Sequence, residues 1–151
     1  MTAAKPILLA EDNPRDAELA LAAMEEEHIS DKVVLCHDGA EVLDYLYCRG
    51  QFKSRLKGNP AVVFLDLKMP KVNGLEVLRT IKSDISLRPI PVVMLTSSRE
   101  EKDVAESYAL GANAYVVKPV EFHQFLTAVK ELGTFWGVIN EPPPEGSASS
   151  N

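Results

Sequence analysis

The chain has 151 residues, of which 46% are hydrophobic and 25% are charged, with a net charge of -6. These values are typical of one globular domain, and the acidic balance argues against nucleic-acid binding. No apolar run approaches the ~20 residues that are needed to span a membrane. The apolar run near the N-terminus is also too short to be the core of a signal peptide. The two cysteines, Cys36 and Cys48, form no CxxC pair. We therefore expect a cytoplasmic protein with reduced thiols and with neither a nucleic-acid nor a membrane partner.

Short apolar runs alternate with helical patterns along the chain. Five runs are expected to form strands: 6–10, 32–36, 61–66, 92–96 and 114–117. Helices are expected over 14–27 and over 40–49, and a third, marked by Leu75, Leu78 and Ile81, is expected to run to about Asp84. Two more are expected from Ser97 or Ser98 to Gly111 and over 122–136. The less regular segment 50–59 is expected to contain an extra helical turn.

Alternation of five strands with five helices predicts a (βα)5 unit of the α/β class. Such a unit forms a doubly wound parallel five-stranded sheet with helices on both faces. The strand order 2-1-3-4-5 of flavodoxin-like folds fits this number of strands. We expect the domain to span residues 1–137. Residues 138–151 are rich in Pro and Ser and are expected to form a disordered tail, too short for an output domain.

Polar residues stand at the ends of four expected strands. Glu11 and Asp12 follow the first, Asp66 ends the third, Thr96 ends the fourth and Lys118 follows the fifth. In the order 2-1-3-4-5 these four strands are consecutive neighbours, so the side chains converge on one edge of the sheet. Crowded acids repel each other, and Mg²⁺ with oxygen ligands would neutralise them together with Lys118. Taken singly, each residue is also compatible with an ordinary solvated strand end.

These residues carry a resemblance to a known family. The residues that carry it are Glu11-Asp12, Asp66-Leu67-Lys68-Met69-Pro70, Gly74, Thr96 and Lys118-Pro119. Together they resemble the receiver domain of two-component response regulators, and the resemblance extends over about residues 5 to 136. The resemblance implies a receiver fold. It also implies a phosphoacceptor that promotes its own phosphorylation and dephosphorylation, and not a classical enzyme.

The resemblance assigns a phosphoacceptor and a metal site. By it, Asp66 accepts the phosphoryl group from a sensor histidine kinase. Asp12, Asp66 and the backbone carbonyl of Lys68 would bind Mg²⁺ directly, and Glu11 would bind it through water.

The resemblance also assigns the groups that read the phosphoryl group. Thr96 and Lys118 would each hold one phosphoryl oxygen. Tyr115, three residues before Lys118, falls on the aromatic switch position of the family. Thr96 and Tyr115 are therefore the expected switch residues.

Three further stretches narrow the resemblance. The long segment 47–60, the sequence YLYCRGQF and the late EFHQFLTAVKELGTFW are similar to small single-domain regulators that partner bacterial phytochrome histidine kinases. That similarity implies a phytochrome-type kinase as partner. We also expect a homodimer through the last helix. The effect would pass through protein contacts, as a phosphorelay intermediate, a phosphate sink or a diffusible messenger.

Two other functional classes compete with this interpretation. A phosphatase of the haloacid-dehalogenase type also uses a nucleophilic Asp, but it needs a second Asp two residues later, where this chain has Lys68. A flavodoxin-type binding module needs a Ser/Thr/Gly-rich phosphate loop after the first strand, where this chain has the acidic EDNPRD. An inert receiver-like scaffold would lack part of the acid–Thr–Lys set.

Overall fold

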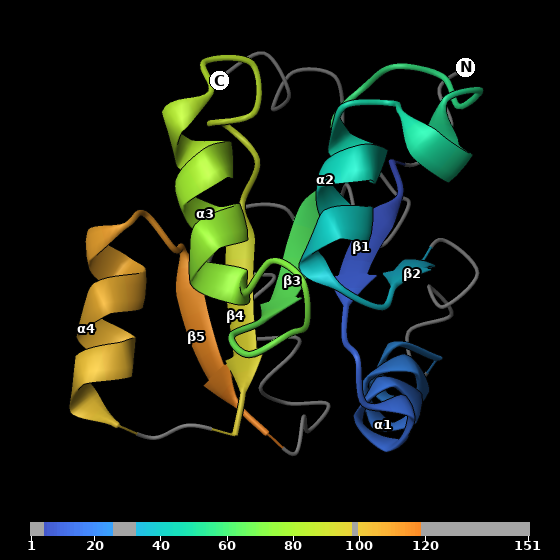
Figure 1. Cartoon of the computed structure of the whole chain (residues 1–151). Coiled ribbons are helices and arrows are strands. Elements are labelled where there is room, and N and C mark those ends of the chain that lie inside the picture. The colour runs from blue at the N-terminus through green and yellow to red at the C-terminus, as the bar shows by residue number, and fades with distance from the viewer. Residues whose placement is uncertain (1–4, 26–32, 98–99, 119–151) are drawn as a thin grey trace, which may run out of the picture.

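The computed structural model describes residues 5–25, 33–97 and 100–118, and these form a parallel sheet with flanking helices (Figure 1). The strands are β1 (Ile7–Ala10), β2 (Val33–Cys36), β3 (Val62–Asp66), β4 (Val92–Thr96) and β5 (Ala114–Val117). They pair in parallel in the order β2-β1-β3-β4-β5. This confirms the predicted flavodoxin-like fold and strand order. The expected helix 122–136, the domain end at 137 and the tail 138–151 lie outside the described residues.

The strands are buried where the apolar runs predicted it. Every residue of β1, β3 and β4 is buried. Strands in the middle of a parallel sheet are covered on both faces, which is why these stretches read as continuous apolar runs. Asp66 and Thr96 end two of these strands and are only 6% and 2% exposed. The fold therefore places polar groups at the rim of a dry core.

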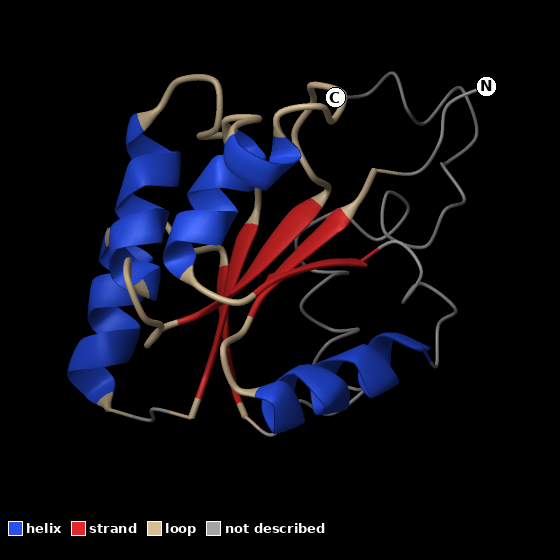
Figure 2. Ribbon diagram, turned by 45° about the vertical axis from the view of Figure 1, so that its right-hand side comes forward, coloured by secondary structure: helices blue, strands red, loops and turns tan. Residues whose placement is uncertain are grey.

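The helices form layers on both faces of the sheet. They are α1 (Pro14–Glu25), α2 (Gly39–Leu46), α3 (Gly74–Ser83) and α4 (Glu101–Ala109), with a 3-10 turn η2 (Gly50–Phe52) after α2. Helices α2 and α3 pack on one face, around Leu65 and Met94, and α1 packs on the other, around Phe64 and Leu95 (Figure 2). Alternate strand residues thus supply two separate cores.

Side-chain caps fix where the helices begin. The Asn13 side chain accepts hydrogen bonds from the backbone of Arg15 and Asp16 and so caps α1, whose start at Pro14 agrees with the expected helix over 14–27. The predicted start of α4 at Ser97 or Ser98 is wrong. Helix α4 begins at Glu101, and its N-cap residue Glu100 provides no side-chain cap. Acidic groups in the first turn, which interact favourably with the helix dipole, favour this later start.

One arginine holds the segment between α2 and β3 in place. The predicted extra helical turn is present as η2. After it, the Arg55 guanidinium lies 3.9 Å above the centre of the Tyr45 ring. It donates hydrogen bonds to the carbonyl of Tyr45 at 2.7 Å and to those of Leu56 and Gly58. The segment is therefore anchored to α2, although Leu56 itself is 89% exposed.

No helix within the described ranges is long and apolar enough to cross a membrane. Cys36 and Cys48 are both free thiols, as predicted, the first buried and the second half-buried. Burial raises the pKa of the Cys36 thiol to about 12, and nearby Glu41, Asp38 and Asp44 add to the shift. Cys36 is therefore a core residue and not a reactive thiol.

Candidate functional site

The carboxyl ends of the strands bring the predicted polar residues to one edge of the sheet. In Figure 1 the strand arrows point toward this lower edge, where α1 begins. The register pairs Asp66 with Leu95, one residue before Thr96. The Lys118 backbone N–H donates to the Thr96 carbonyl at 2.8 Å, which extends the pairing of β5 with β4. Residues far apart in sequence therefore meet because neighbouring strands end together.

Lys118 is the centre of this edge. Its Nζ lies 2.6 Å from Glu11 Oε1, 2.9 Å from Asp66 Oδ2 and 2.9 Å from Asp16 Oδ2. The side chains of Glu11, Asp66 and Lys118 are only 2%, 8% and 10% exposed. An ammonium group has three N–H donors, so all three are used by carboxylates.

The second oxygen of Asp66 is held separately. The backbone N–H of Lys68 donates to Asp66 Oδ1 at 3.3 Å. Directly after this loop, Gly74 begins α3 so close to β3 that an added Cβ would lie 2.1 Å from the Asp66 carbonyl oxygen. Gly39, at the start of α2, meets the same loop at the Val72 carbonyl. The loop that follows Asp66 is thus enclosed by backbone on both sides.

The acids form a group that fits a divalent cation. Glu11, Asp12 and Asp66 each offer a carboxylate oxygen, and these oxygens lie within 4.8 Å of one another. Glu11 and Asp66 are buried, whereas Asp12 is exposed. Hard oxygen donors at this spacing suit Mg²⁺, which accepts a few carboxylates together with water. The predicted backbone ligand, the Lys68 carbonyl, stays a prediction.

Burial sets the electrostatics of the cluster. It raises the pKa of Glu11 to about 7, an effect that the hydrogen bond from Lys118 opposes and that the nearby Asp66 increases. Burial also acts to lower the pKa of Lys118, but its bonds to Glu11, Asp16 and Asp66 outweigh this and raise it above its usual value. Lys118 therefore stays charged, and it partly neutralises an acid-rich site.

The two predicted switch residues lie in different places. Thr96 is 2% exposed at the end of β4, next to the strand that carries Asp66. Tyr115 is half-buried on β5, pairs with Met94, and packs against the core under α2 and α3. The structure thus brings Thr96 to the site edge and places Tyr115 on a face of the sheet.

The sequence prediction missed Asp16 as a member of the site. It gave this residue no role in the site. The available signal was its place in the first turn of the helix that follows the first strand, because that turn lies at the sheet edge where the strands end.

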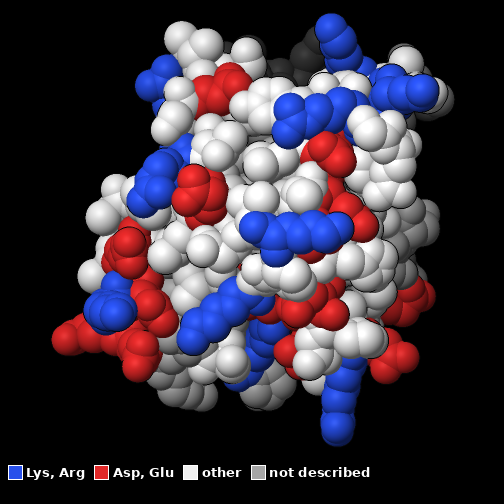
Figure 3. Space-filling model, in the orientation of Figure 1, with Lys and Arg blue, Asp and Glu red and all other residues white. Residues whose placement is uncertain are grey.

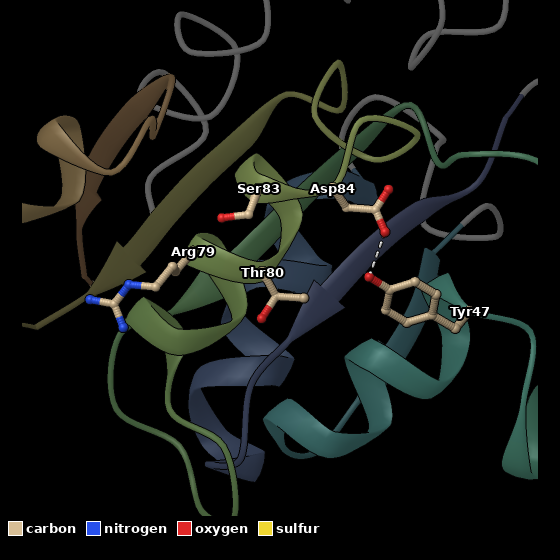
Figure 4. Close-up of a pocket in the computed structure, with 5 residues that line it drawn as sticks. All are labelled: Tyr47, Arg79, Thr80, Ser83 and Asp84. Atoms are coloured by element: carbon tan, nitrogen blue, oxygen red, sulfur yellow. Dashed lines mark hydrogen bonds between the residues drawn. The ribbon is translucent and has the colours of Figure 1, made fainter.

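A shallow depression lies at the opposite edge of the sheet, and no strand-end residue lines it. Figure 4 shows the Tyr47 hydroxyl donating to Asp84 across it at 2.7 Å. It is lined by Tyr47, Arg79, Thr80, Ser83 and Asp84. Its residues come from the ends of α2 and α3, so it is separate from the acid cluster.

Comparison with known proteins decides the family. The family model described as the response regulator receiver domain matches residues 7–130. The chain belongs to the response regulator receiver family. The match includes β1 to β5 and every strand-end residue of the site. It confirms the resemblance and implies a histidine kinase partner, a general phosphoacceptor role and Mg²⁺ binding at an acidic cluster.

This receiver is similar to phytochrome response regulators along most of its length. The structure of the bacteriophytochrome response regulator RtBRR is 60% identical in sequence and has a TM-score of 0.82. The match covers 96% of this chain and 87% of that chain. The structure of the phosphorylated cyanobacterial phytochrome response regulator RcpA is 39% identical, with a TM-score of 0.73 and coverage of 89% and 94%.

Response regulator Rcp1 of Synechocystis sp. is 34% identical over 132 residues, which cover 87% of this chain and 88% of Rcp1. The structure of its Mn²⁺-bound form has a TM-score of 0.72 and covers 87% of this chain and 94% of that chain. The receiver is therefore related to phytochrome response regulators.

Proposed function

We propose that the protein is a single-domain response regulator that accepts a phosphoryl group on Asp66 from a sensor histidine kinase. The observation that carries this proposal is the environment of Asp66. Its carboxylate is buried at a strand end, 2.9 Å from the Lys118 ammonium, with the Glu11 and Asp12 carboxylates beside it. A site of this kind presents a nucleophilic oxygen next to groups that neutralise phosphoryl charge.

The residues fit Mg²⁺, and Glu11, Asp12 and Asp66 would hold it, with the Lys68 carbonyl as a further ligand. When bound, Mg²⁺ would supply positive charge next to the phosphoryl oxygens. The four carboxylates Glu11, Asp12, Asp16 and Asp66 exceed the single charge of Lys118, so a divalent cation would reduce the remaining repulsion. The related Rcp1 has a Mn²⁺-bound form, which supports binding of a divalent cation by this receiver.

The transfer step needs no general base, because the nucleophile is a carboxylate paired with the Lys118 ammonium. An Asp66 oxygen forms the new bond to phosphorus, and the bond from phosphorus to the kinase histidine nitrogen breaks. The electron pair of that bond returns to the imidazole. Lys118 and the Thr96 hydroxyl hold phosphoryl oxygens as the group arrives, so the protein contributes position and charge.

The same site would also reverse the modification. An acyl phosphate on Asp66 is open to in-line attack by water, which restores the carboxylate and releases phosphate. The residue after Thr96, Ser97, is small and exposed, and so leaves space beside the phosphoryl group. We therefore propose that the protein promotes both its own phosphorylation and its own dephosphorylation.

The switch would link Thr96 to Tyr115. We propose that Thr96 moves toward the phosphoryl group and that Tyr115 then turns inward and reshapes the face near β5 and α4. Tyr115 lies two residues from Val117, the register partner of Thr96, so one short segment joins the two. The phosphoryl group must favour this arrangement through contacts that it does not make in the arrangement of the unmodified protein.

The relatives guide the proposal for partners. RtBRR and RcpA are named as phytochrome response regulators, so we propose a bacterial phytochrome kinase as phosphodonor. We further propose a cytoplasmic receiver domain over residues 1–137, a disordered tail over 138–151, and a homodimer through the last helix.

Incubation with acetyl phosphate and Mg²⁺, followed by intact mass spectrometry, tests the function. The wild type should gain the mass of one phosphoryl group, and Asp66→Asn should gain none. Asp84→Asn is the matched control, because it removes an exposed carboxylate at the other edge, and it should be labelled like wild type. Tyr115→Ala should be labelled but should lose the phosphorylation-dependent change in self-association.

Two results would contradict this account. An unlabelled wild type, or equal labelling of Asp66→Asn, would exclude Asp66 as the phosphoacceptor. Unchanged phosphorylation-dependent self-association in Tyr115→Ala would remove this residue from the switch and leave the phosphoacceptor role intact.

A further inference from the structure

Asp16 is the third carboxylate that contacts Lys118, the residue that would bind a phosphoryl oxygen. It lies in the first turn of α1, whereas Glu11 and Asp66 stand at strand ends. Its Oδ2 is 2.9 Å from Lys118 Nζ, the same distance as Asp66 Oδ2. Its side chain is 31% exposed, against 2% for Glu11 and 8% for Asp66. Among the three partners of Lys118, Asp16 is therefore the one in contact with water.

The start of α1 explains why Asp16 turns toward Lys118. With Asn13 as N-cap, Asp16 is the third helical residue, and an acid there commonly bonds back to the N–H of the cap residue. Here that N–H already donates to Glu11 Oε2 at 3.1 Å. The Asp16 backbone N–H meanwhile donates to the Asn13 side chain at 3.1 Å. The carboxylate of Asp16 is thus left without its usual local partner.

The three donors of Lys118 leave no hydrogen for a phosphoryl oxygen. One of its three carboxylate partners must release it before the ammonium can bind the phosphoryl group. Releasing Glu11 would leave a carboxylate that is 98% buried without its charge partner, which is costly. Releasing Asp16 exposes a carboxylate that water already reaches, and this costs little. Of the two partners that are not the phosphoacceptor, Asp16 is therefore the one whose release costs less.

We propose that Asp16 is a positioning residue that holds Lys118 in the unmodified receiver and competes with the phosphoryl group for it. This inference rests on the proposed function of Asp66. In the free protein Asp16 fixes the ammonium between Glu11 and Asp66. When a phosphoryl oxygen arrives, Asp16 gives up its hydrogen bond and becomes solvated. Asp16 thus sets how tightly the phosphorylated state is held.

The test uses the full chain with Mg²⁺ and beryllium fluoride, a non-covalent mimic of the phosphoryl group, titrated by NMR of backbone amides. An ion pair at this exposure is worth ~0.2–1 kcal/mol, so Asp16→Ala should bind the mimic about 1.4- to 5-fold more tightly than wild type. Asp16→Glu should bind it close to wild type. Glu18→Ala is the matched control, because it removes an exposed acid from the same helix, and it should not change the affinity.

A second readout follows the Lys118 ammonium itself. Its side-chain ¹⁵N signal in the metal-free protein should shift in Asp16→Ala and stay in place in Glu18→Ala, which a merely structural role of Asp16 would not produce. Equal affinities of Asp16→Ala and Glu18→Ala for the mimic, or an unmoved ammonium signal, would overturn the inference while the wild type still binds. A wild type that does not bind the mimic would overturn the proposed function, and the inference with it.

Discussion

Asp66 and Asp84 lie at opposite edges of the same sheet and have opposite environments. Asp66 is buried, and its partner is a buried ammonium group in a cluster of four acids. Asp84 is open to solvent and accepts hydrogen bonds from the neutral Tyr47 hydroxyl and from the Ser86 backbone N–H. Burial makes the first arrangement costly unless charges are balanced, whereas water balances the second. The comparison teaches that strand-end burial, more than the presence of an acid, determines how strongly the charges of a site interact.

The surface shows the same contrast. On the face seen in Figure 3, Lys and Arg side chains are interspersed with Asp and Glu, and acidic side chains gather over α4. Each of those exposed charges is screened by water and salt. The charges around Lys118 are mostly withdrawn from solvent, so they interact strongly with one another and with any group that enters.

The largest effect should come from removing the cation at the buried edge. Lys118→Ala leaves the buried Glu11 and Asp66 carboxylates without a positive charge partner, and the free energy of unfolding should fall by about 3–5 kcal/mol in metal-free buffer. Mg²⁺ should restore much of this loss, because it can replace the missing positive charge. Urea unfolding with and without Mg²⁺ measures both quantities.

Lys71→Ala is the control for that experiment. Lys71 is 69% exposed and pairs with Asp38 at 3.4 Å, so its loss should change stability by less than ~1 kcal/mol and should give no special response to Mg²⁺. Equal losses in the two variants would mean that the acids at the buried edge do not depend on Lys118.

An intermediate effect is expected in the segment before β3. Arg55→Ala removes a cation–π contact and hydrogen bonds to three carbonyls, which together should cost about 2 kcal/mol in urea unfolding. Lys53→Ala, on the same segment but exposed, should have little effect. Phosphoryl uptake on Asp66 should be unchanged in both variants, and a loss of uptake in Arg55→Ala would show that the two edges are coupled.

The smallest effect belongs to the exposed acid. The Tyr47 hydrogen bond lowers the pKa of Asp84 below its ordinary value of 3.8, with a second contribution from the Ser86 N–H. A lowered pKa stabilises the folded protein above the unfolded pKa, and this stability is lost as the pH falls through the folded value. Tyr47→Phe should therefore be slightly less stable than wild type at neutral pH. The difference should begin to shrink near pH 3.8 and should be lost as the pH falls through the lowered pKa of folded Asp84.

Carboxylate ¹³C titration by NMR gives the direct measurement, with the Asp84 pKa expected to rise in Tyr47→Phe. Identical Asp84 titration curves in the two proteins would contradict the role of the hydroxyl.

Much of the fold and the site could be predicted because both follow from strand ends. Apolar runs located β1, β3 and β4, and the strand order then placed Asp66, Thr96 and Lys118 side by side without any side-chain detail. The contact of Asp16 could not be predicted in this way. It depends on which acceptor occupies the Asn13 N–H, and that is decided by the local geometry of Glu11.

Two other features could not be predicted from the sequence, for related reasons. The predicted start of α4 was wrong because Ser97 and Ser98 are good caps by residue type, whereas the helix begins at Glu101. The bond between Tyr47 and Asp84 joins residues 37 positions apart at two helix ends, and exposed pairs of this kind leave no periodic signal.

The two glycines around the loop after Asp66 limit how this receiver could have changed over time. At Gly74 an added methyl group would overlap the Asp66 carbonyl, and at Gly39 it would overlap the Val72 carbonyl at 1.9 Å. Both neighbours are backbone atoms, which no change of rotamer can move aside. Lys68 and Lys71 between them are exposed and carry no such restriction. Diversification near Asp66 is thus confined to side chains that project outward, while the path of the loop stays the same.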